Sequence, residues 1–147
     1  MDSTTIMKPY VLFELAGTAY AIPSVDVQRM EMIEHVTPVP NAASFVDGVV
    51  FSRGKVVPAV NLRSRFGFER VDYDLKTRLI VVAQADRLVG LIVDSAREFV
   101  SIPENAIQPP PDSMVGTSGR YLRGVADVAG RIILVLDVAG VLEAAAI

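Results

Sequence analysis

The chain has 147 residues, 51% of them hydrophobic and 21% charged, and its 14 Lys and Arg against 17 Asp and Glu give a net charge of −3. This length suits one domain or two small halves with a shared core, and the apolar fraction excludes global disorder. A mildly acidic chain does not favour nucleic-acid binding, and the lack of cysteine excludes disulfides, Cys-ligated zinc, iron–sulfur clusters and thiol nucleophiles.

The predicted elements begin with a β-hairpin. The composition favours strands, because the 23 Val and 10 Ile are β-branched residues that suit a pleated sheet. We expect residues 1–9 to form a flexible N-terminus. Residues 10–15 and 19–22 should pair as strands around a turn at Ala16-Gly17-Thr18.

A short helix is predicted after Pro23, with Ser24 as its N-cap. Apolar residues recur there among polar ones at a spacing near that of a helix. We expect the segment to end before Pro38, because proline cannot continue a helix. Its apolar positions are Val25, Val27, Met30 and Ile33.

The rest of the chain predicts three more hairpins. Gly54 and Gly130 stand at turns, where glycine accepts a positive φ. One segment, residues 94–100, fits either a helix or a strand. The Pro-rich and Gly-containing stretch from Pro109 to Gly119 predicts a mobile loop of unknown role. The expected strand pairs are 46–51 with 55–62, 78–83 with 88–93, and 121–128 with 131–138, followed by a short helix that ends within 143–146.

Two parts of the chain repeat each other at an offset of 76 residues. Gly48 lies six residues before Gly54, and Gly124 lies six residues before Gly130. A short polar residue between aliphatic ones follows each second glycine, and an aromatic residue precedes each first one. The repeat predicts an all-β fold of two similar five-stranded β-barrels around a shared hydrophobic core, with approximate halves 10–70 and 77–143. The matching polar and aromatic residues are Asn61 and Asp137, and Phe45 and Tyr121.

The sequence offers no constellation of catalytic side chains. His35 is the single histidine, and it lies in a polar stretch before a proline. Residues 116–119 lack the lysine and the following helix of a phosphate-binding loop. Asp72 and Asp74 lie in a charged connection that is typical of a solvated surface. We therefore expect no enzyme activity and no catalytic, cofactor-binding or metal-binding residue.

No apolar run reaches the roughly 18 residues of a membrane helix, and the N-terminus lacks the basic and apolar regions of a signal peptide. We expect a cytoplasmic protein with no direct membrane insertion. Val27 and Met30 can be ordinary core residues or one wall of an apolar groove for a partner helix. Ala96 and Phe99 occupy the equivalent place in the second half, and periodicity alone does not separate the two cases.

The stretch Gly-Val-Val-Phe-Ser-Arg-Gly-Lys-Val-Val-Pro-Ala-Val-Asn-Leu-Arg-Ser-Arg-Phe, residues 48–66, resembles the CheW family of chemotaxis coupling proteins. Segments on both sides are similar to that family in the same order, so that the resemblance covers roughly residues 8–143. These segments are residues 10–13, 20–23, 37–40, 77–82, 89–94, 122–125 and 134–137.

The resemblance implies a CheW-like domain over residues 10–143, built from two SH3-like barrels around a common core. It also implies a non-catalytic adaptor that couples the cytoplasmic tip of a chemoreceptor to the regulatory domain of a CheA-type histidine kinase. Such a protein would be cytoplasmic and held at membrane-associated arrays by its partners. It would carry no cofactor.

The resemblance also assigns roles to single residues. Arg53 corresponds to an arginine in the family's Arg-Gly turn and is expected to contact a partner, as an exposed multi-donor side chain can. Gly48 and Gly54 match glycines that keep this hairpin tight. Val27 and Met30 match groove residues that receive the receptor helix, and Ala96 and Phe99 match the opposite wall.

Some positions depart from the family pattern, and other functions stay open. Arg29 stands where an acidic residue is common, a charge reversal beside the expected groove. The protein could therefore be a diverged coupling protein of a non-flagellar chemosensory system. The alternative from another class is a small-ligand sensor that binds a metabolite or nucleotide between the two barrels, although the sequence shows no convergent polar set for it.

Overall fold

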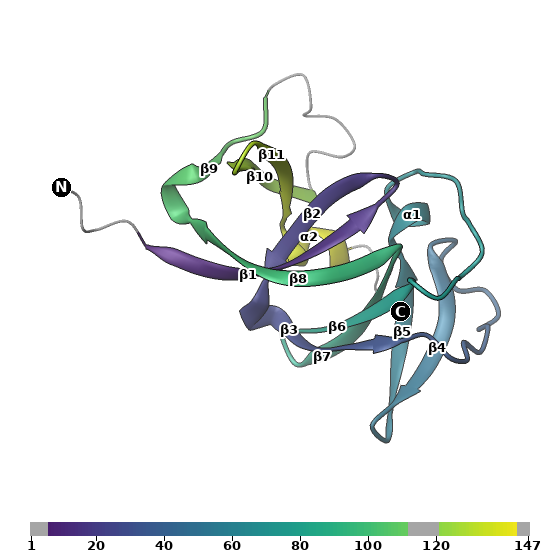
Figure 1. Ribbon diagram of the computed structural model, residues 1–147. Coiled ribbons are helices and arrows are strands. Elements are labelled where there is room, and N and C mark those ends of the chain that lie inside the picture. The colour runs from purple at the N-terminus through teal and green to yellow at the C-terminus, as the bar shows by residue number, and fades with distance from the viewer. Residues whose placement is uncertain (1–5, 112–120, 144–147) are drawn as a thin grey trace.

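Two β-sheets make up most of the computed structural model, which describes residues 6–111 and 121–143 apart from the side chain of Arg97 (Figure 1). The expected mobile loop from residue 112 onward and the expected helical residues 144–146 lie outside the described residues. The mostly β fold class is confirmed. The six-stranded sheet has the order β8 (Ser95–Pro103), β1 (Met7–Leu15), β2 (Thr18–Pro23), β11 (Arg131–Leu136), β10 (Leu122–Val128), β9 (Ile107–Gln108).

The five-stranded sheet has the order β3 (Val27–Met32), β6 (Arg78–Gln84), β7 (Arg87–Val93), β5 (Lys55–Asn61), β4 (Val46–Ser52). Short helices connect or follow the strands. The two 3₁₀ turns are η1 (Ser24–Asp26) and η2 (Glu104–Ala106), and the two α-helices are α1 (Leu62–Arg65) and α2 (Val138–Leu142).

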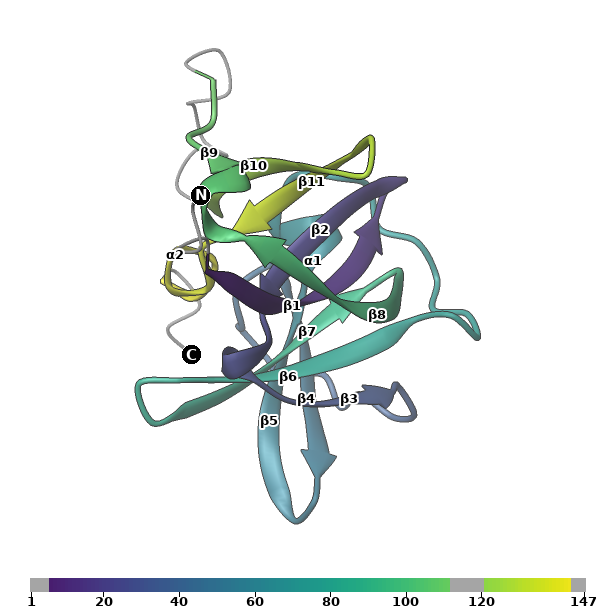
Figure 2. The same cartoon turned by 60° about the vertical axis from the view of Figure 1, so that its left-hand side comes forward.

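Each sheet takes strands from both of the ranges 10–70 and 77–143. The strands β1 and β2 pair with β8 and β11 from the later part of the chain, whereas β3 pairs with β6 and β5 pairs with β7. Two parallel pairs, β5 with β7 and β11 with β2, join the ranges, as Figure 2 shows for the neighbouring β2 and β11. The sheets therefore do not coincide with the two sequence ranges.

Hydrogen bonds and bulges confirm the 76-residue repeat. The Asn61 N–H donates to the Phe45 carbonyl at 2.7 Å, and the Asp137 N–H donates to the Tyr121 carbonyl at 2.8 Å. Asn61 and Asp137 are the N-cap residues of α1 and α2. The register shifts between positions 46 and 48 in β4 and between the matching 122 and 124 in β10. The repeat unit is thus a bulged hairpin followed by a short helix.

The bulge in β4 depends on Gly48. Gly48 has φ 150°, and a Cβ built on it would lie 2.1 Å from the carbonyl oxygen of Thr37. Thr37 and Val49 form two backbone hydrogen bonds of 2.9 Å, so this close approach is part of the sheet. Only glycine leaves room for it.

The predicted helix after Pro23 is wrong, because the chain forms only η1 there and then continues as β3. A register shift lies between Val27 and Arg29 in the pairing of β3 with β6. One extra residue in a bulge places the inward side chains of Val27 and Met30 three positions apart instead of two. The bulge therefore imitates the spacing of a helix, and pairing with β6 decides the outcome.

Other boundaries also differ from the expectation. The first strand begins at Met7, inside the expected flexible N-terminus, because Met7–Pro9 pair with Ser101–Pro103 of β8. The ambiguous segment 94–100 lies almost entirely in β8 and is a strand. The strand expected over 55–62 ends at Asn61, and residues 62–65 form α1 because the Asn61 side chain accepts a hydrogen bond from the Ser64 N–H at 3.1 Å.

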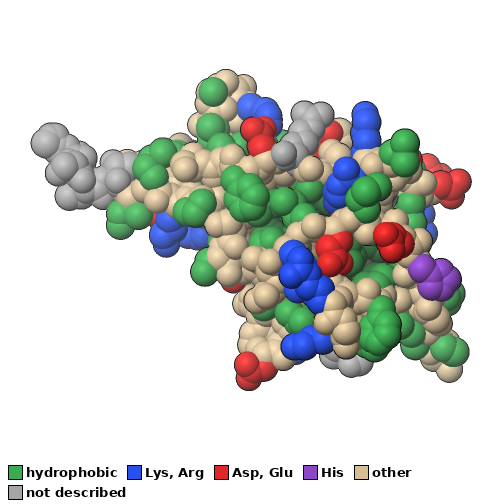
Figure 3. All heavy atoms as spheres, turned by 60° about the horizontal axis from the view of Figure 1, so that its bottom comes forward, with side chains coloured by type: hydrophobic (Ala, Val, Ile, Leu, Met, Phe, Trp, Pro, Cys, Tyr) green, Lys and Arg blue, Asp and Glu red, His purple; other side chains and the backbone are tan. Residues whose placement is uncertain are grey.

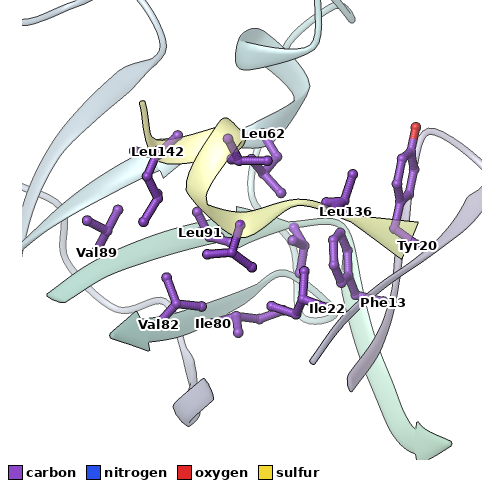
Figure 4. Packing of buried hydrophobic residues seen from close by; sticks show 14 of the residues in the cluster. Phe13, Tyr20, Ile22, Leu62, Ile80, Val82, Val89, Leu91, Leu136 and Leu142 are labelled. Atoms are coloured by element: carbon purple, nitrogen blue, oxygen red, sulfur yellow. The ribbon is translucent and has the colours of Figure 1, made fainter. Parts of the chain in front are cut away.

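The main core lies between the two sheets and under α2. Figure 4 shows side chains from β1, β2, β6, β7 and β11 turned toward Leu62 and Leu142 of the two α-helices. A chain of rings, Phe13, Tyr20, Phe66 and Tyr121, has successive centroids 5.7, 5.9 and 5.1 Å apart. Full burial of one such side chain stabilises the fold by roughly 1.5–3 kcal/mol, so this core holds both sheets together.

Candidate partner-binding surfaces

The four expected groove residues lie along the outer strands β3 and β8. Their cross-strand partners are Val82 for Val27, Ile80 for Met30, Phe13 for Ala96 and Val11 for Phe99. All four partners are fully buried in the main core. Since residues directly opposite each other share a face of a sheet, the four residues lie on the inner faces of the two sheets. We call Val27, Met30, Ala96 and Phe99 the inter-sheet edge.

The inter-sheet edge is part core and part surface. Val27, Met30 and Ala96 are partly buried and pack against the main core. Phe99 is 60% exposed, although its partner Val11 is fully buried. The strand β8 also contacts β6, the neighbour of β3, so the two outer strands lie on the same side of the molecule (Figures 1 and 2). The edge therefore presents an apolar rim with one large exposed ring.

Arg53 lies at the tip of the β4–β5 hairpin. Arg53 has φ 51° and Gly54 has φ 80°, and Ser52 pairs with Lys55 across this two-residue turn. A turn with both central residues at positive φ matches the twist of a hairpin. Ala129 and Gly130 adopt the same conformation in the β10–β11 turn, so the backbone does not require an arginine. The exposed Arg53 side chain is free to serve a contact.

A buried polar network holds the base of this turn. Ser52 is 2% exposed, and its hydroxyl donates to the Glu31 carboxylate at 3.0 Å. The Arg29 guanidinium donates to the Ser52 hydroxyl at 2.7 Å and to Glu31 at 3.1 Å. The Arg29 guanidinium is thus engaged within the protein, where it ties β3 to β4, the two outer strands of the five-stranded sheet.

Two hollows flank Arg53. The larger has a volume of about 760 Å³ and an apolar floor from Ile33, Val50, Val56 and Leu79. The smaller has a volume of about 400 Å³ and cationic walls. Arg53 lines both. His35 also lines the larger hollow. In Figure 3, hydrophobic side chains and an acidic side chain lie next to this purple histidine, and a patch of Lys and Arg side chains lies farther toward the middle of the view.

Two further polar networks were not expected from the sequence. The Arg63 guanidinium binds the Asp94 carboxylate at 2.8 and 2.7 Å, and the Ala16 N–H donates to Asp94 at 2.9 Å. Burial alone would raise the pKa of Asp94, but the hydrogen bonds from Arg63 and Ala16 and the attraction to Arg63 outweigh it and hold this pKa below its usual value. The network fastens α1 to the end of β7.

The second network fastens the connection between α1 and β6. Asp47 accepts hydrogen bonds from Arg70, from the Tyr73 hydroxyl and from the Asn61 amide, the last at 3.0 Å. Burial would raise the pKa of Asp47, but the hydrogen bonds from Tyr73, Arg70 and Asn61 lower it further than burial raises it. Nothing in the local pattern pairs these residues, because they meet only across the folded chain.

Within residues 6–111 and 121–143, no group of three His, Asp or Glu side chains is placed to hold a metal ion. None of the helices in these ranges has both the length and the apolar character needed to span a bilayer. The geometry therefore consists of surfaces: an apolar edge, an exposed arginine turn and two hollows beside it.

Comparison with known proteins matches a CheW-like domain model over residues 9–146. The chemotaxis protein CheW of Klebsiella aerogenes is 31% identical over 134 residues, which cover 91% of this chain and 81% of that protein. The chemotaxis protein CheW of Thermotoga maritima is also 31% identical, over 89% of this chain and 85% of that protein. The crystal structure of the scaffolding protein TtCheW from Thermoanaerobacter tengcongensis superposes with a TM-score of 0.83, at 31% identity over 90% of both chains.

Proposed function

The chain belongs to the CheW-like family of chemotaxis coupling proteins, and we propose that it joins the cytoplasmic tip of a chemoreceptor to the regulatory domain of a CheA-type histidine kinase. In this role it is a non-catalytic scaffold without a cofactor. It is cytoplasmic and reaches membrane-associated arrays only through its partners.

The inter-sheet edge is the proposed seat for the receptor helix. The observation that carries this proposal is the exposed Phe99 beside the partly buried Val27, Met30 and Ala96, all on the inner faces of the two sheets. An amphipathic helix buries its apolar stripe against such a rim, and a large aromatic side chain is the type of residue that dominates interface energies. Arg53 supplies a second, charged contact at the end of the five-stranded sheet.

We also propose that the two sheets correspond to two SH3-like barrels within one domain over residues 10–143. The outer strands β8 and β9 of the six-stranded sheet follow each other in the chain across η2. In the five-stranded sheet, Thr37 follows β3 and bonds to Val49 of β4, and Arg29 bonds to Ser52. These links support a curved, barrel-like form for each sheet, although no ladder between described strands joins the first strand of a sheet to its last.

Binding to both partners tests the proposal. Purified full-length protein is titrated with a receptor cytoplasmic fragment and, separately, with the kinase regulatory domain. We expect Phe99→Ala to weaken receptor binding at least tenfold and to leave kinase binding unchanged. The control is Ile132→Ala, which shortens a comparably exposed apolar side chain (54%) on β11, outside the inter-sheet edge and both hollows, and should leave receptor binding unchanged.

Arg53→Glu is expected to weaken binding to one of the two partners without changing the melting temperature, since an exposed turn residue contributes little stability. Absence of binding to either partner by the unmodified protein contradicts the coupling role. Unchanged binding by Phe99→Ala contradicts the assignment of the inter-sheet edge, and unchanged binding by Arg53→Glu contradicts that of the turn.

A further inference from the structure

Four cationic side chains line the smaller hollow at the end of the five-stranded sheet. They come from three separate places in the chain: Arg29 on β3, Arg53 and Lys55 at the β4–β5 hairpin, and Arg87 at the start of β7. Asp86 is the one acidic residue in the lining. The hollow is a product of the fold, because β3 and β4 lie at opposite ends of the strand order.

The charge in this hollow is opposite to that of the chain. The whole protein has a net charge of −3, whereas the lining carries four cations and one carboxylate. Glu31 offsets Arg29, with which it forms an ion pair at 3.1 Å. Among the described residues, no ion pair neutralises Arg53 or Lys55. The protein thus concentrates positive charge in one concave place.

Such a cluster destabilises the free protein, since like charges held close together repel each other. A concave wall also focuses the field of its charges and raises the local concentration of anions. Guanidinium groups match phosphate oxygens with two parallel donors, and the amides of Gln28 and Gln84 in the same lining add uncharged donors. These groups together favour an anion with several oxygens over a single carboxylate.

We propose that this hollow binds a small anion with two or more phosphate groups. Its volume of about 400 Å³ lies within the range of roughly 300–1,000 Å³ for small-molecule sites and exceeds the needs of one phosphate. The bound anion pairs with Arg53, Lys55 and Arg87. Because Arg53 also belongs to the proposed partner surface, a bound anion competes with any partner that uses Arg53. Anion binding itself does not depend on the coupling role.

Isothermal titration of the full chain with inorganic pyrophosphate tests this site without any partner present. We expect saturable binding that weakens as salt is added and that exceeds the binding of orthophosphate and sulfate at equal ionic strength. Lys55→Glu should weaken pyrophosphate binding at least tenfold. Arg131→Glu is the matched control, because Arg131 is the residue 76 positions after Lys55, at the same place of the β10–β11 hairpin and outside the hollow.

Arg87→Gln is a second variant, which removes one positive charge without introducing a negative one. Melting temperatures confirm that each variant folds. Retention of binding by Arg131→Glu together with its loss in Lys55→Glu supports the site. Equal loss in both variants indicates attraction to net charge only and overturns the proposal. No binding of pyrophosphate, or binding of a polyglutamate peptide in its place, also overturns it.

Discussion

The Arg65 Nε donates a hydrogen bond of 3.1 Å to the carbonyl oxygen of Val141, which lies 76 residues further along the chain. This separation equals the repeat offset, so the bond joins equivalent helices, α1 and α2. The guanidinium of Arg65 also lies 4.5 Å from the ring centroid of Phe45 and 4.8 Å from that of Tyr121. Phe45 and Tyr121 are themselves equivalent in the repeat. One side chain thus connects the two copies at four matching positions.

Arg65→Met should lower the free energy of unfolding by about 1–2 kcal/mol, because it removes two cation–π contacts and a charge-assisted hydrogen bond. The loss of stability is limited because the buried Arg65 Nη2 has no hydrogen-bond partner among the described residues, which is itself unfavourable in the native protein. Urea denaturation measures the change. Arg131→Met, which removes a surface ion pair with Glu98 at 3.6 Å, is the control and should change stability by at most roughly 0.5 kcal/mol. An equal effect of both variants would contradict the connecting role of Arg65.

Gly48→Ala should destabilise the protein by about 2–4 kcal/mol, because the new methyl group would collide with the Thr37 carbonyl and break the bridge to Val49. Gly54→Ala is the matched comparison in the same hairpin. At Gly54 no atom lies within 4 Å of an added Cβ, and only the positive φ of 80° opposes the change, at about 1–2 kcal/mol. This explanation would be refuted if denaturation gave a larger loss in the free energy of unfolding for Gly54→Ala than for Gly48→Ala.

Ser52→Ala should lower the free energy of unfolding by about 1–3 kcal/mol, since it leaves the partly buried side chains of Arg29 and Glu31 without their common buried partner. The β4–β5 turn should also loosen. Amide hydrogen exchange is therefore expected to accelerate at residues 52–55 and to stay unchanged in the β10–β11 turn. Ser101→Ala, at an exposed position of β8, controls for the loss of a hydroxyl group. Unchanged exchange at residues 52–55 would show that the network does not hold the turn.

Stability should fall in acid partly through Asp94. Its folded pKa lies below the ordinary value because of Arg63 and Ala16, despite the opposing effect of burial. A depressed pKa contributes stability that is complete above the unfolded pKa of about 3.9 and is lost as pH falls through the folded pKa. Asp94→Asn should therefore lower stability at pH 7 and flatten the decline of stability below about pH 5. Denaturation at several pH values measures the stability of Asp94→Asn and of Asp72→Asn, in which the replaced carboxylate is exposed. Identical dependence of stability on pH in the two variants would contradict the prediction.

The candidate surfaces were partly predictable from the sequence. The place of Arg53 at a hairpin tip was predictable from Gly54, because a two-residue turn is set by two residues adjacent in the sequence. The role of Arg29 was not predictable, since its partner Ser52 is 23 positions away and on another strand. The hollow around Lys55 and Arg87 was missed for the same reason. Local sequence patterns do not predict which strands, far apart in the chain, become neighbours in a sheet.

The turns, the strand-rich composition, the 76-residue repeat and the family resemblance can all be read from the amino-acid sequence, because turn chemistry and apolar spacing act between residues close in the chain. That residues 27–32 form a strand follows instead from their pairing with β6, where a bulge and the pairing outweigh the helix-like spacing. The position of β3 and β8 beside the same core likewise depends on the folded chain. Strand pairing depends on hydrogen bonds between distant segments and on the burial of their side chains in a common core. These interactions form only when the whole chain folds.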